Sequence, residues 1–348
     1  MPFMGGLMNN MFLQACRGEQ VEYTPVWLMR QAGRYLPQYQ AVRANVDFLT
    51  LCKTPELAAE VTLQPVEILG VDAAILFSDI LIPVEAMGMS LEFTEKSGPV
   101  LGEPLRNKSA VDKLIVPDTE DDMPFVIETI RILREKLTVP LIGFSGAPFT
   151  LATYMIEGGS SKNFVHTKKM MFQNSRLFQY LMEKLTLMVT SYLAAQIRAG
   201  VQAVQIFDTW AGAVTPTDYR ESVLPFVKKV IAELKKEGVP VIYFANDCSG
   251  ILHEVKKSGA DVFGIDWKID ISDAIKKLGK KAVVQGNLDP CALFLSKEEI
   301  EERVKDILWK GETARGHIFN LGHGILPETP VEHAVALVEA VHKYGKKG

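Results

Sequence analysis

The chain alternates short, apolar, β-rich runs with longer segments in which apolar residues recur at helical spacing. This alternation is typical of βα units around a parallel sheet, because two parallel strands need a crossover connection, usually a helix. Eight such runs occur, at residues 25–29, 72–78, 139–145, 201–207, 239–245, 260–266, 281–287 and 317–323. The pattern therefore predicts an α/β fold in which residues 1–348 form a single (β/α)8 barrel of the TIM type.

A doubly wound open sheet is the alternative α/β architecture for this pattern. Its dinucleotide-binding form carries G-x-G-x-x-G after the first strand, and that motif is absent here. The connection between residues 80 and 140 is long for a barrel, and residues 85–105 have the composition of a small hairpin. We therefore expect an inserted hairpin after the second strand, over the active face, where long barrel insertions usually lie.

Several helix starts can be read directly from the sequence. Thr54 and Thr329 each precede a proline, a residue that is favoured in the first turn of a helix. Ser296 with Glu299 three residues later forms the pattern of a capping box. Residues 121–136 place apolar side chains on one helical face and charges on the other, so we expect an amphipathic helix there.

The charge balance argues against a nucleic-acid partner. Lys and Arg together number 38 against 42 Asp and Glu, so there is no general basic excess. No apolar run approaches the roughly 20 residues of a membrane-spanning helix, so we expect no membrane association. The first 16 residues lack Lys and Arg, unlike a signal peptide, and a cytoplasmic location is the expectation.

The sequence contains no familiar metal or nucleotide motif. Its cysteines are too scattered for a disulfide framework or a zinc cluster: Cys16, Cys52, Cys248 and Cys291. Both H-E-x-x-H and G-x-x-x-x-G-K-[ST] are absent. We therefore expect chemistry that proceeds without a metal or a recognisable nucleotide cofactor.

Polar and charged residues follow the predicted strands. Barrel enzymes place their reactive groups at the carboxyl ends of the strands, so these residues are expected to meet around the mouth of the barrel. They are Arg30, Arg34, Asp79, Ser145, Asp208, Thr209, Asn246, Asp247, Asp266, Asn287, Asp289 and His323. The predicted ring mixes carboxylates, cations and one histidine.

Arg30 and Arg34 stand directly after the first run, in PVWLMRQAGRYLP, in a chain that is acidic overall. A guanidinium fork suits the planar, bidentate capture of a carboxylate or a phosphate. The pair therefore predicts a multiply anionic ligand. The alternative is that either arginine forms a structural ion pair with a neighbouring strand-end aspartate.

Asp79 and His323 are the other candidates for chemistry. Asp79 ends an apolar strand, so its carboxylate is expected to be partly desolvated and directed at the barrel mouth; its structural alternative is to cap the next turn or to pair with an arginine. His323 lies between Gly322 and Gly324, which leave the backbone free to bend and the imidazole accessible. Such a histidine can donate or carry protons near neutral pH, although a structural role remains the alternative.

Four motifs together carry a family resemblance: PVWLMRQAGRYLP, FSDIL, GFSGAPFTLATYMIEGG and NLGHGILP. They resemble the uroporphyrinogen decarboxylase family in order and spacing, from about residue 20 to the C-terminus. The resemblance implies that the chain converts uroporphyrinogen III to coproporphyrinogen III in haem biosynthesis, by removing four acetate carboxyls as carbon dioxide. It also implies a distorted (β/α)8 barrel that forms a homodimer and works without a cofactor.

The resemblance assigns expected roles to the residues around the first motif. Arg30 and Arg34, with Arg43 further along, are expected to hold the carboxylates of the tetrapyrrole. The remaining substrate-binding residues implied for this motif are Gln31, Ala32 and Gly33.

The other roles implied by the resemblance centre on Asp79, which is expected to project to the middle of the macrocycle and accept its pyrrole N–H groups. Tyr154, Thr209 and His323 are expected to contact the substrate arms, and Phe144 and Phe207 to line the pocket. The family often has Ser where this chain has Thr209; since a hydroxyl is kept, we expect the same hydrogen bond. The catalytic set implied by these matches is Asp79, Arg30, His323 and Tyr154.

The proton donor is left open by the sequence. Arg30 is one candidate, but a guanidinium holds its proton tightly. His323 and a water polarised by Arg30 are the others. Two alternative functions are a zinc-dependent methyltransferase of corrinoid or thiol substrates, which would need a His-x-Cys pair that is absent, and a non-catalytic tetrapyrrole carrier.

Overall fold

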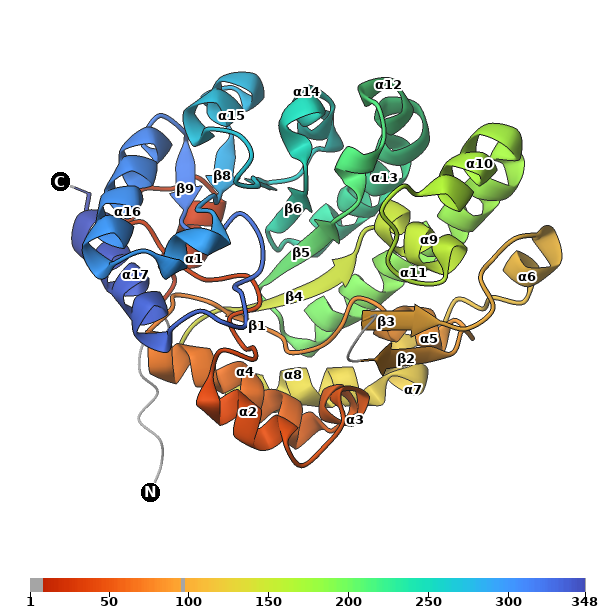
Figure 1. The fold of residues 1–348 in the computed structure, drawn as a ribbon, viewed down its shortest axis with the longest axis horizontal. Coiled ribbons are helices and arrows are strands. Elements are labelled where there is room, and N and C mark those ends of the chain that lie inside the picture. Colours follow the sequence, from red (N-terminus) through yellow and green to blue (C-terminus); the bar gives the residue numbers. More distant parts are fainter. Residues whose placement is uncertain (1–8, 95–97, 348) are drawn as a thin grey trace.

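The computed structural model describes residues 9–94 and 98–347. Within them, seven parallel strands form one curved sheet in the order β1-β4-β5-β6-β7-β8-β9, with helices around its outer side (Figure 1). The strands are β1 (Ala74–Ile75), β4 (Leu141–Gly146), β5 (Ala203–Asp208), β6 (Val241–Ala245), β7 (Val262–Gly264), β8 (Val283–Gln285) and β9 (Gly316–Ile318). Each predicted run from 72–78 onward overlaps one strand, so the predicted α/β barrel is confirmed.

The helices fill the connections between the strands. They are α1 (Met11–Cys16), α2 (Pro37–Arg43), α3 (Phe48–Lys53), α4 (Pro55–Leu69), α5 (Ile82–Ala86), α6 (Lys108–Asp112), α7 (Thr119–Asp122), α8 (Pro124–Lys136), α9 (Pro148–Glu157), α10 (Val165–Gln173), α11 (Ser175–Ala199), α12 (Pro216–Asp218), α13 (Leu224–Leu234), α14 (Leu252–Val255), α15 (Ile271–Leu278), α16 (Lys297–Gly311) and α17 (Val331–Tyr344). A π-helical turn, Tyr219–Val223, joins α12 to α13; the 3-10 turns are Ala211–Ala213, Lys235–Glu237, Cys248–Gly250, Lys256–Ser258 and Pro290–Phe294.

Local sequence signals account for several of these boundaries. Ser296 and Glu299 form the predicted capping box at the start of α16. Thr54 is the N-cap residue of α4, whereas α17 is capped by Pro330, one residue after Thr329. Helix α15 shows why the helices cover the sheet, because its residues at positions i, i+3, i+4 and i+7 are all buried: Ile271, Ala274, Ile275 and Leu278. No helix in the described part of the chain is long and apolar enough to cross a bilayer.

The first predicted strand differs from the expectation. Residues 25–29 form no strand, but they bridge the gap between β9 and β1: Phe319 N–H donates to the Pro25 carbonyl at 2.8 Å, and Asp72 N–H donates to the Val26 carbonyl at 2.8 Å. Only one isolated parallel bridge forms here, between Val26 and Phe319, with Trp27 N–H donating to the Phe319 carbonyl at 3.3 Å. Side chains take up the other amides of this segment. Val26 N–H donates to Asp72 Oδ2 at 2.8 Å, and Met29 N–H donates to Asn320 Oδ1 at 2.9 Å. The barrel is thus closed irregularly at this point.

Asp72 is the centre of this closure. Its carboxylate is almost fully buried, and besides Val26 it accepts hydrogen bonds from the Tyr23 hydroxyl at 2.7 Å and Asn9 Nδ2 at 3.0 Å. His342 Nε2, from α17, lies 2.8 Å from Oδ2. One side chain therefore joins the N-terminal segment, the start of β1 and the C-terminal helix.

The barrel interior contains a buried chain of amides. Trp27 Nε1 donates to Gln285 Oε1 at 2.9 Å, and Gln285 Nε2 donates to Gln205 Oε1 at 3.0 Å. All three residues are fully buried, so these bonds satisfy polar groups that would otherwise be costly inside the barrel. They also fix the irregular first segment against β8 and β5.

The predicted hairpin is present. Strands β2 (Leu91–Thr94) and β3 (Gly98–Leu101) pair antiparallel, after the second predicted strand. Leu101 N–H donates to the Gly158 carbonyl at 3.1 Å, which ties the hairpin to the end of α9, and the Phe93 ring lies 4.6 Å from that of Phe48 in α3. The insertion therefore packs beside α3, which precedes β1, and beside the end of α9, which follows β4.

We predict that Asp72→Ala strongly destabilises the fold. The substitution leaves the Val26 amide and the Tyr23 hydroxyl without their buried acceptor, and losses of this kind cost about 3 kcal/mol or more. Urea unfolding followed by circular dichroism would measure the change. As a control, Asp273→Ala removes an exposed ion pair with Lys276 and should leave the unfolding midpoint nearly unchanged. Equal midpoints for the two variants would contradict the role given to Asp72.

Candidate active site

Arg30 stands at the end of the irregular first segment with its backbone in the left-handed region, at φ 59°. Its exposed side chain crosses the backbone of Gly324, because a Cβ at position 324 would lie only 2.4 Å from Arg30 Cδ. The two motifs are further joined by a hydrogen bond from Ile325 N–H to the Met29 carbonyl at 2.9 Å. Only glycine at position 324 leaves room for Arg30 in this position.

The structure brings Asp79 and Tyr154 into the electrostatic field of Arg30. Burial raises the pKa of the Asp79 carboxyl, against the opposing effects of the Leu81 N–H, which donates to Oδ1 at 2.8 Å, and of the Arg30 guanidinium. Burial also raises the pKa of Tyr154, with Asp79 adding to the shift and Arg30 opposing it. Asp79 therefore caps the turn at Leu81 and is at the same time a poorly solvated carboxylate near a cation.

His323 lies in the same field, but it differs from the expectation that it titrates near neutral pH. Burial, reinforced by the Arg30 guanidinium, lowers the pKa of His323 to about 4, although Asp266 and Asp247 oppose the shift. The imidazole is therefore neutral at pH 7. Its ring lies 6.2 Å from those of both Phe244 and Trp267.

Aromatic rings connect His323 to the opposite side of the barrel mouth. Phe144 on β4 lies 5.6 Å from Phe207 on β5, and Phe207 lies 6.1 Å from Phe244 on β6, measured between ring centroids. The structure thus groups the predicted residues Phe144, Phe207 and His323. It adds Phe244 and Trp267, which the sequence reasoning missed because it collected only polar residues at the strand ends. Trp267 directly follows Asp266, so the same strand-end rule could have found it.

Trp210, a third aromatic residue that sequence reasoning missed, directly follows Thr209 and lies beside Tyr154. The Trp210 ring lies 5.8 Å from that of Tyr154, and its backbone N–H donates to Thr150 Oγ1 at 3.2 Å. The Thr209 carbonyl accepts a hydrogen bond from Asn246 Nδ2 at 3.4 Å. Thr209 itself is half-buried and directly follows β5.

The remaining residues of the first motif have different environments. The Gln31 side chain is buried and fully used, because Oε1 accepts from Leu28 N–H at 3.0 Å and Nε2 donates to the Ala73 carbonyl at 3.0 Å. Ala32 and Gly33 are half-buried, Arg34 is exposed, and Arg43 is half-buried with Nη1 donating to the Val46 carbonyl. The Gln31 backbone is also engaged, because its N–H donates to the Leu28 carbonyl at 3.0 Å and its carbonyl accepts from the Tyr35 hydroxyl at 2.8 Å.

The predicted arginines do not form structural ion pairs. Among residues 9–94 and 98–347, no carboxylate lies within ion-pair distance of three side chains: Arg30, Arg34 and Arg43. This removes the structural alternative considered for the first two. Guanidinium groups without carboxylate partners at a barrel mouth favour an anionic ligand.

Other members of the predicted ring are structural. Buried Asp208 accepts from Thr150 Oγ1 at 2.6 Å and the Tyr243 hydroxyl at 2.7 Å, and burial raises its pKa to about 6. Asp266 accepts from the Cys248 and Lys268 amides, both at 2.7 Å. These carboxylates already hold two donors each, so they position the loops at the mouth.

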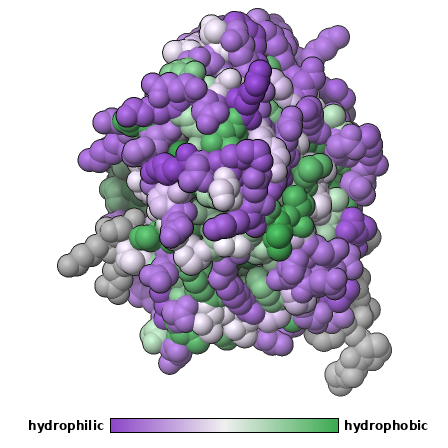
Figure 2. Space-filling view, turned by 90° about the vertical axis from the view of Figure 1, so that its right-hand side faces the viewer, coloured by the Kyte–Doolittle hydropathy of each residue, from purple (hydrophilic) through white to green (hydrophobic). Residues whose placement is uncertain are grey.

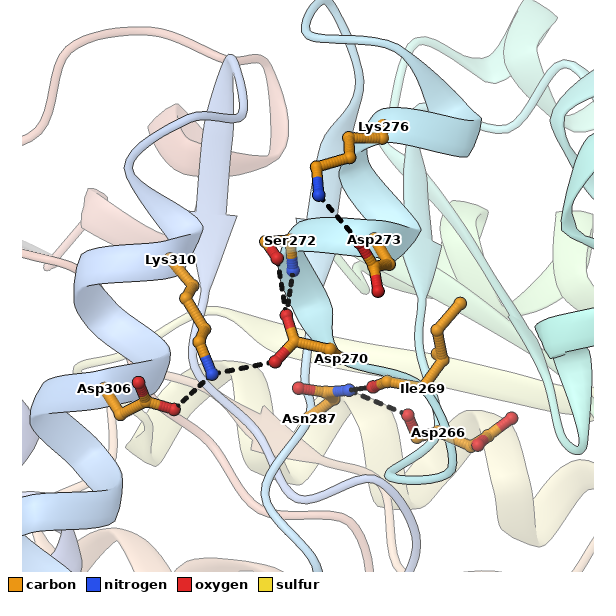
Figure 3. A network of polar contacts seen from close by, with 9 residues as sticks. All are labelled: Asp266, Ile269, Asp270, Ser272, Asp273, Lys276, Asn287, Asp306 and Lys310. Atoms are coloured by element: carbon orange, nitrogen blue, oxygen red, sulfur yellow. Dashed lines mark hydrogen bonds and ion pairs between the residues drawn. The ribbon is translucent and has the colours of Figure 1, made fainter.

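Figure 3 shows that Asn287 also serves the scaffold. Its Nδ2 donates to the Asp266 and Ile269 carbonyls, both at 2.8 Å. The network continues beside it through Asp270, which binds Lys310 at 2.7 Å. The other polar strand-end residues also bond locally: Ser145 to the Gly146 carbonyl, Asp247 to Lys268, and Asp289 to the Cys291 amide.

The described residues contain no cluster of three or more His, Cys, Asp or Glu side chains that could hold a metal ion. The groups that converge at the mouth are instead a desolvated carboxylate, guanidinium groups, a neutral imidazole and aromatic rings. Such a set can bind an anion and stabilise a cation that develops beside the carboxylate.

A parallel barrel with charged and aromatic side chains gathered at the carboxyl ends of its strands is characteristic of α/β-barrel enzymes, and the chain is an enzyme of this class. The sequence profile of the family described as Uroporphyrinogen decarboxylase (URO-D) matches residues 7–344. The uroporphyrinogen decarboxylase of Desulfotalea psychrophila is 56% identical over 98% of this chain and 100% of its own length, and that of Geobacter metallireducens is 55% identical over the same shares. The chain belongs to the uroporphyrinogen decarboxylase family and is a carboxy-lyase.

Solved structures agree on the fold. A methyltransferase from Methanosarcina mazei superimposes with a TM-score of 0.82 at 23% identity, covering 97% of this chain and 99% of that one. A B12-independent methionine synthase from Shewanella reaches a TM-score of 0.57 at 12% identity, covering 83% of this chain and 88% of that one. At such low identity these neighbours show the shared barrel alone, and the methyltransferase alternative is not favoured.

We predict that Gly324→Ala impairs the site more than the fold. The added methyl group would meet Arg30 Cδ and displace the guanidinium, and misplacement of a binding group by about 1 Å can cost on the order of tenfold to a hundredfold in kcat/KM. Steady-state kinetics and thermal unfolding would be measured together. Gly250→Ala is the matched control, because nothing lies within 4 Å of its added Cβ. Wild-type kinetics for Gly324→Ala would contradict this assignment.

Proposed function

We propose that the chain decarboxylates the four acetate arms of uroporphyrinogen III to methyl groups, giving coproporphyrinogen III. Each arm loses one carbon dioxide and takes up one proton, so four protons are consumed. Membership in the family and the names of relatives more than half identical over nearly the whole chain support this substrate. The observation that carries the chemistry is the poorly solvated carboxylate of Asp79 in the field of Arg30.

We propose that the substrate carboxylates bind to arginines of the first motif. Arg30, Arg34 and Arg43 have no carboxylate partner within the described residues, so their charge remains available to an octacarboxylic tetrapyrrole. The Ala32 and Gly33 backbone lies between two of them. The row of rings from Phe144 to Phe244 supplies an apolar wall for the macrocycle.

Loss of carbon dioxide leaves an electron pair that needs an acceptor. Protonation of the pyrrole on a ring carbon creates that acceptor as an iminium-like cation, into which the electrons of the breaking bond move. The methylene group then takes up a proton to become methyl, and the ring carbon releases the proton it gained. In this proposal Asp79 accepts the pyrrole N–H groups and stabilises the cation, an electrostatic effect that is large when the carboxylate is poorly solvated.

We propose that the proton reaches the substrate from water polarised by Arg30. His323 is a weak source because its pKa is lowered to about 4, so it holds no extra proton at pH 7. A guanidinium gives up its proton reluctantly. Neutral His323 and Tyr154, whose pKa burial raises, are then hydrogen-bonding groups for the substrate arms.

We also propose a single catalytic domain that forms a homodimer and works without a cofactor, as the family resemblance implies, and that is located in the cytoplasm. One continuous cluster of buried apolar residues supports the single domain. Figure 2 shows apolar patches on a largely hydrophilic face. On α10, the exposed fraction of Phe172 is 60% and that of Val165 is 46%. Contact with a second copy would remove such side chains from water. Light scattering in solution tests the homodimer.

We predict that Asp79→Asn lowers kcat/KM by about a hundredfold or more, since removal of a preorganised electrostatic group typically costs this much. Products from uroporphyrinogen III would be followed anaerobically by mass spectrometry, and the unaltered protein should show four successive losses of carbon dioxide. Asp273→Asn is the control, because Asp273 is an exposed carboxylate on α15 that pairs with Lys276. No carbon dioxide loss by the unaltered protein, with substrate bound and reduced, would refute the proposed function.

The proposed state of His323 predicts a particular pH dependence. The imidazole is neutral both at pH 6 and at pH 8, since its pKa of about 4 lies below both. The factor by which His323→Gln lowers kcat should therefore be the same at the two pH values. A factor that shrinks towards pH 8 would mean that the protonated imidazole acts as the acid.

A further inference from the structure

A hollow of about 410 Å³ opens at the opposite end of the barrel from Arg30. Its lining includes residues that directly precede four neighbouring strands: Pro240 before β6, Asp261 before β7, Ala282 before β8 and Arg315 before β9. Cys16 and Arg17, at the end of α1, contribute to the same wall. The hollow therefore lies at the amino ends of the strands, which play no part in the chemistry proposed above.

Positive charge predominates in the lining of this hollow. Four cations line it, Arg17, Lys235, Lys281 and Arg315, but a single carboxylate, Asp261. That carboxylate is already occupied, because Oδ1 pairs with Lys235 at 2.6 Å and Oδ2 accepts from the Val241 amide at 3.0 Å. Within the described residues, the other three cations have no carboxylate at ion-pair distance. They carry unneutralised positive charge in a chain whose formal net charge is -4.

The Arg315 side chain is held against the backbone of Gly18. Its side chain lies across Gly18, where an added Cβ would come within 2.6 Å of Nε and 2.8 Å of Cδ. Gly18 has φ 65°, a conformation that favours glycine, and its carbonyl accepts a long hydrogen bond from Arg315 Nε at 3.4 Å. The Arg315 amide also donates to the Ala282 carbonyl at 3.0 Å. The two terminal guanidinium nitrogens thus remain for a ligand, on a side chain that has already lost part of its freedom.

We propose that this hollow binds a multivalent phosphate anion of the charge class of inorganic triphosphate. Three cations without carboxylate partners match such a ligand in charge, and a guanidinium with neighbouring ammonium and guanidinium groups can contact several tetrahedral oxygen groups at once. The site takes part in no bond-making step. A ligand there stabilises the folded chain by mass action and leaves the barrel mouth free for substrate.

Calorimetric titration of the full chain with inorganic triphosphate, at low ionic strength, tests the proposal. Lys281→Gln and Arg315→Gln should each weaken binding by about tenfold, because each removes a charged contact. Lys169→Gln on α10 is a matched surface control that should change nothing. Arg34→Gln should also bind normally, since Arg34 does not line this hollow. Raising the salt concentration should weaken binding to the unaltered protein.

Three outcomes would overturn the inference. The first is no binding of millimolar triphosphate at low salt, with the fold verified by circular dichroism. The second is binding that Arg34→Gln abolishes and Arg315→Gln leaves intact, which would assign the anion to the barrel mouth. The third is equally tight binding of citrate, a tricarboxylate of similar charge, which would show that the hollow does not select phosphate.

Discussion

The closure of the barrel between β9 and β1 is the constraint on which the site depends. Residues 25–29 fill this gap with a single isolated bridge, because the side chains of Asp72, Gln31 and Asn320 take three of the amides that a neighbouring strand would otherwise hold. The segment can therefore leave the sheet at its carboxyl end and turn through a left-handed residue at Arg30. Irregular backbone held by buried side chains thus positions the guanidinium over Gly324.

Burial sets the chemical character of the groups around that guanidinium. It raises the pKa of Asp79 and lowers that of His323, and Arg30 opposes the first shift and adds to the second. Asp79 in the unliganded site is a carboxylate with little solvation, and a cation forming beside it would relieve that cost. His323 by contrast is kept neutral. The Asp79 carboxyl and the His323 imidazole, which both lie near the Arg30 guanidinium, are therefore suited to different roles.

The two ends of the barrel differ in how their charges are matched. Many Lys residues on the outer helices pair with carboxylates three or four positions away, as in α16. At the mouth and at the opposite hollow, arginines lack such partners among the described residues. Where several unpaired cations gather around one mouth or hollow of a chain with net acidic charge, an anion can bind. Structural carboxylates such as Asp208, by contrast, already accept hydrogen bonds from two donors within the fold.

The alternation of apolar runs and helical segments determined the barrel, because seven of the eight runs form parallel strands and parallel strands need a helix to return the chain between them. Motif spacing determined the family, and the strand-end rule located Asp79 and His323. Tertiary structure alone decided that residues 25–29 would not pair as a strand, since the partners Asp72 and Asn320 lie far away in sequence. It also decided the neutral state of His323 and the ring contacts of Trp210 and Trp267, because burial and packing depend on neighbours that the folded chain supplies.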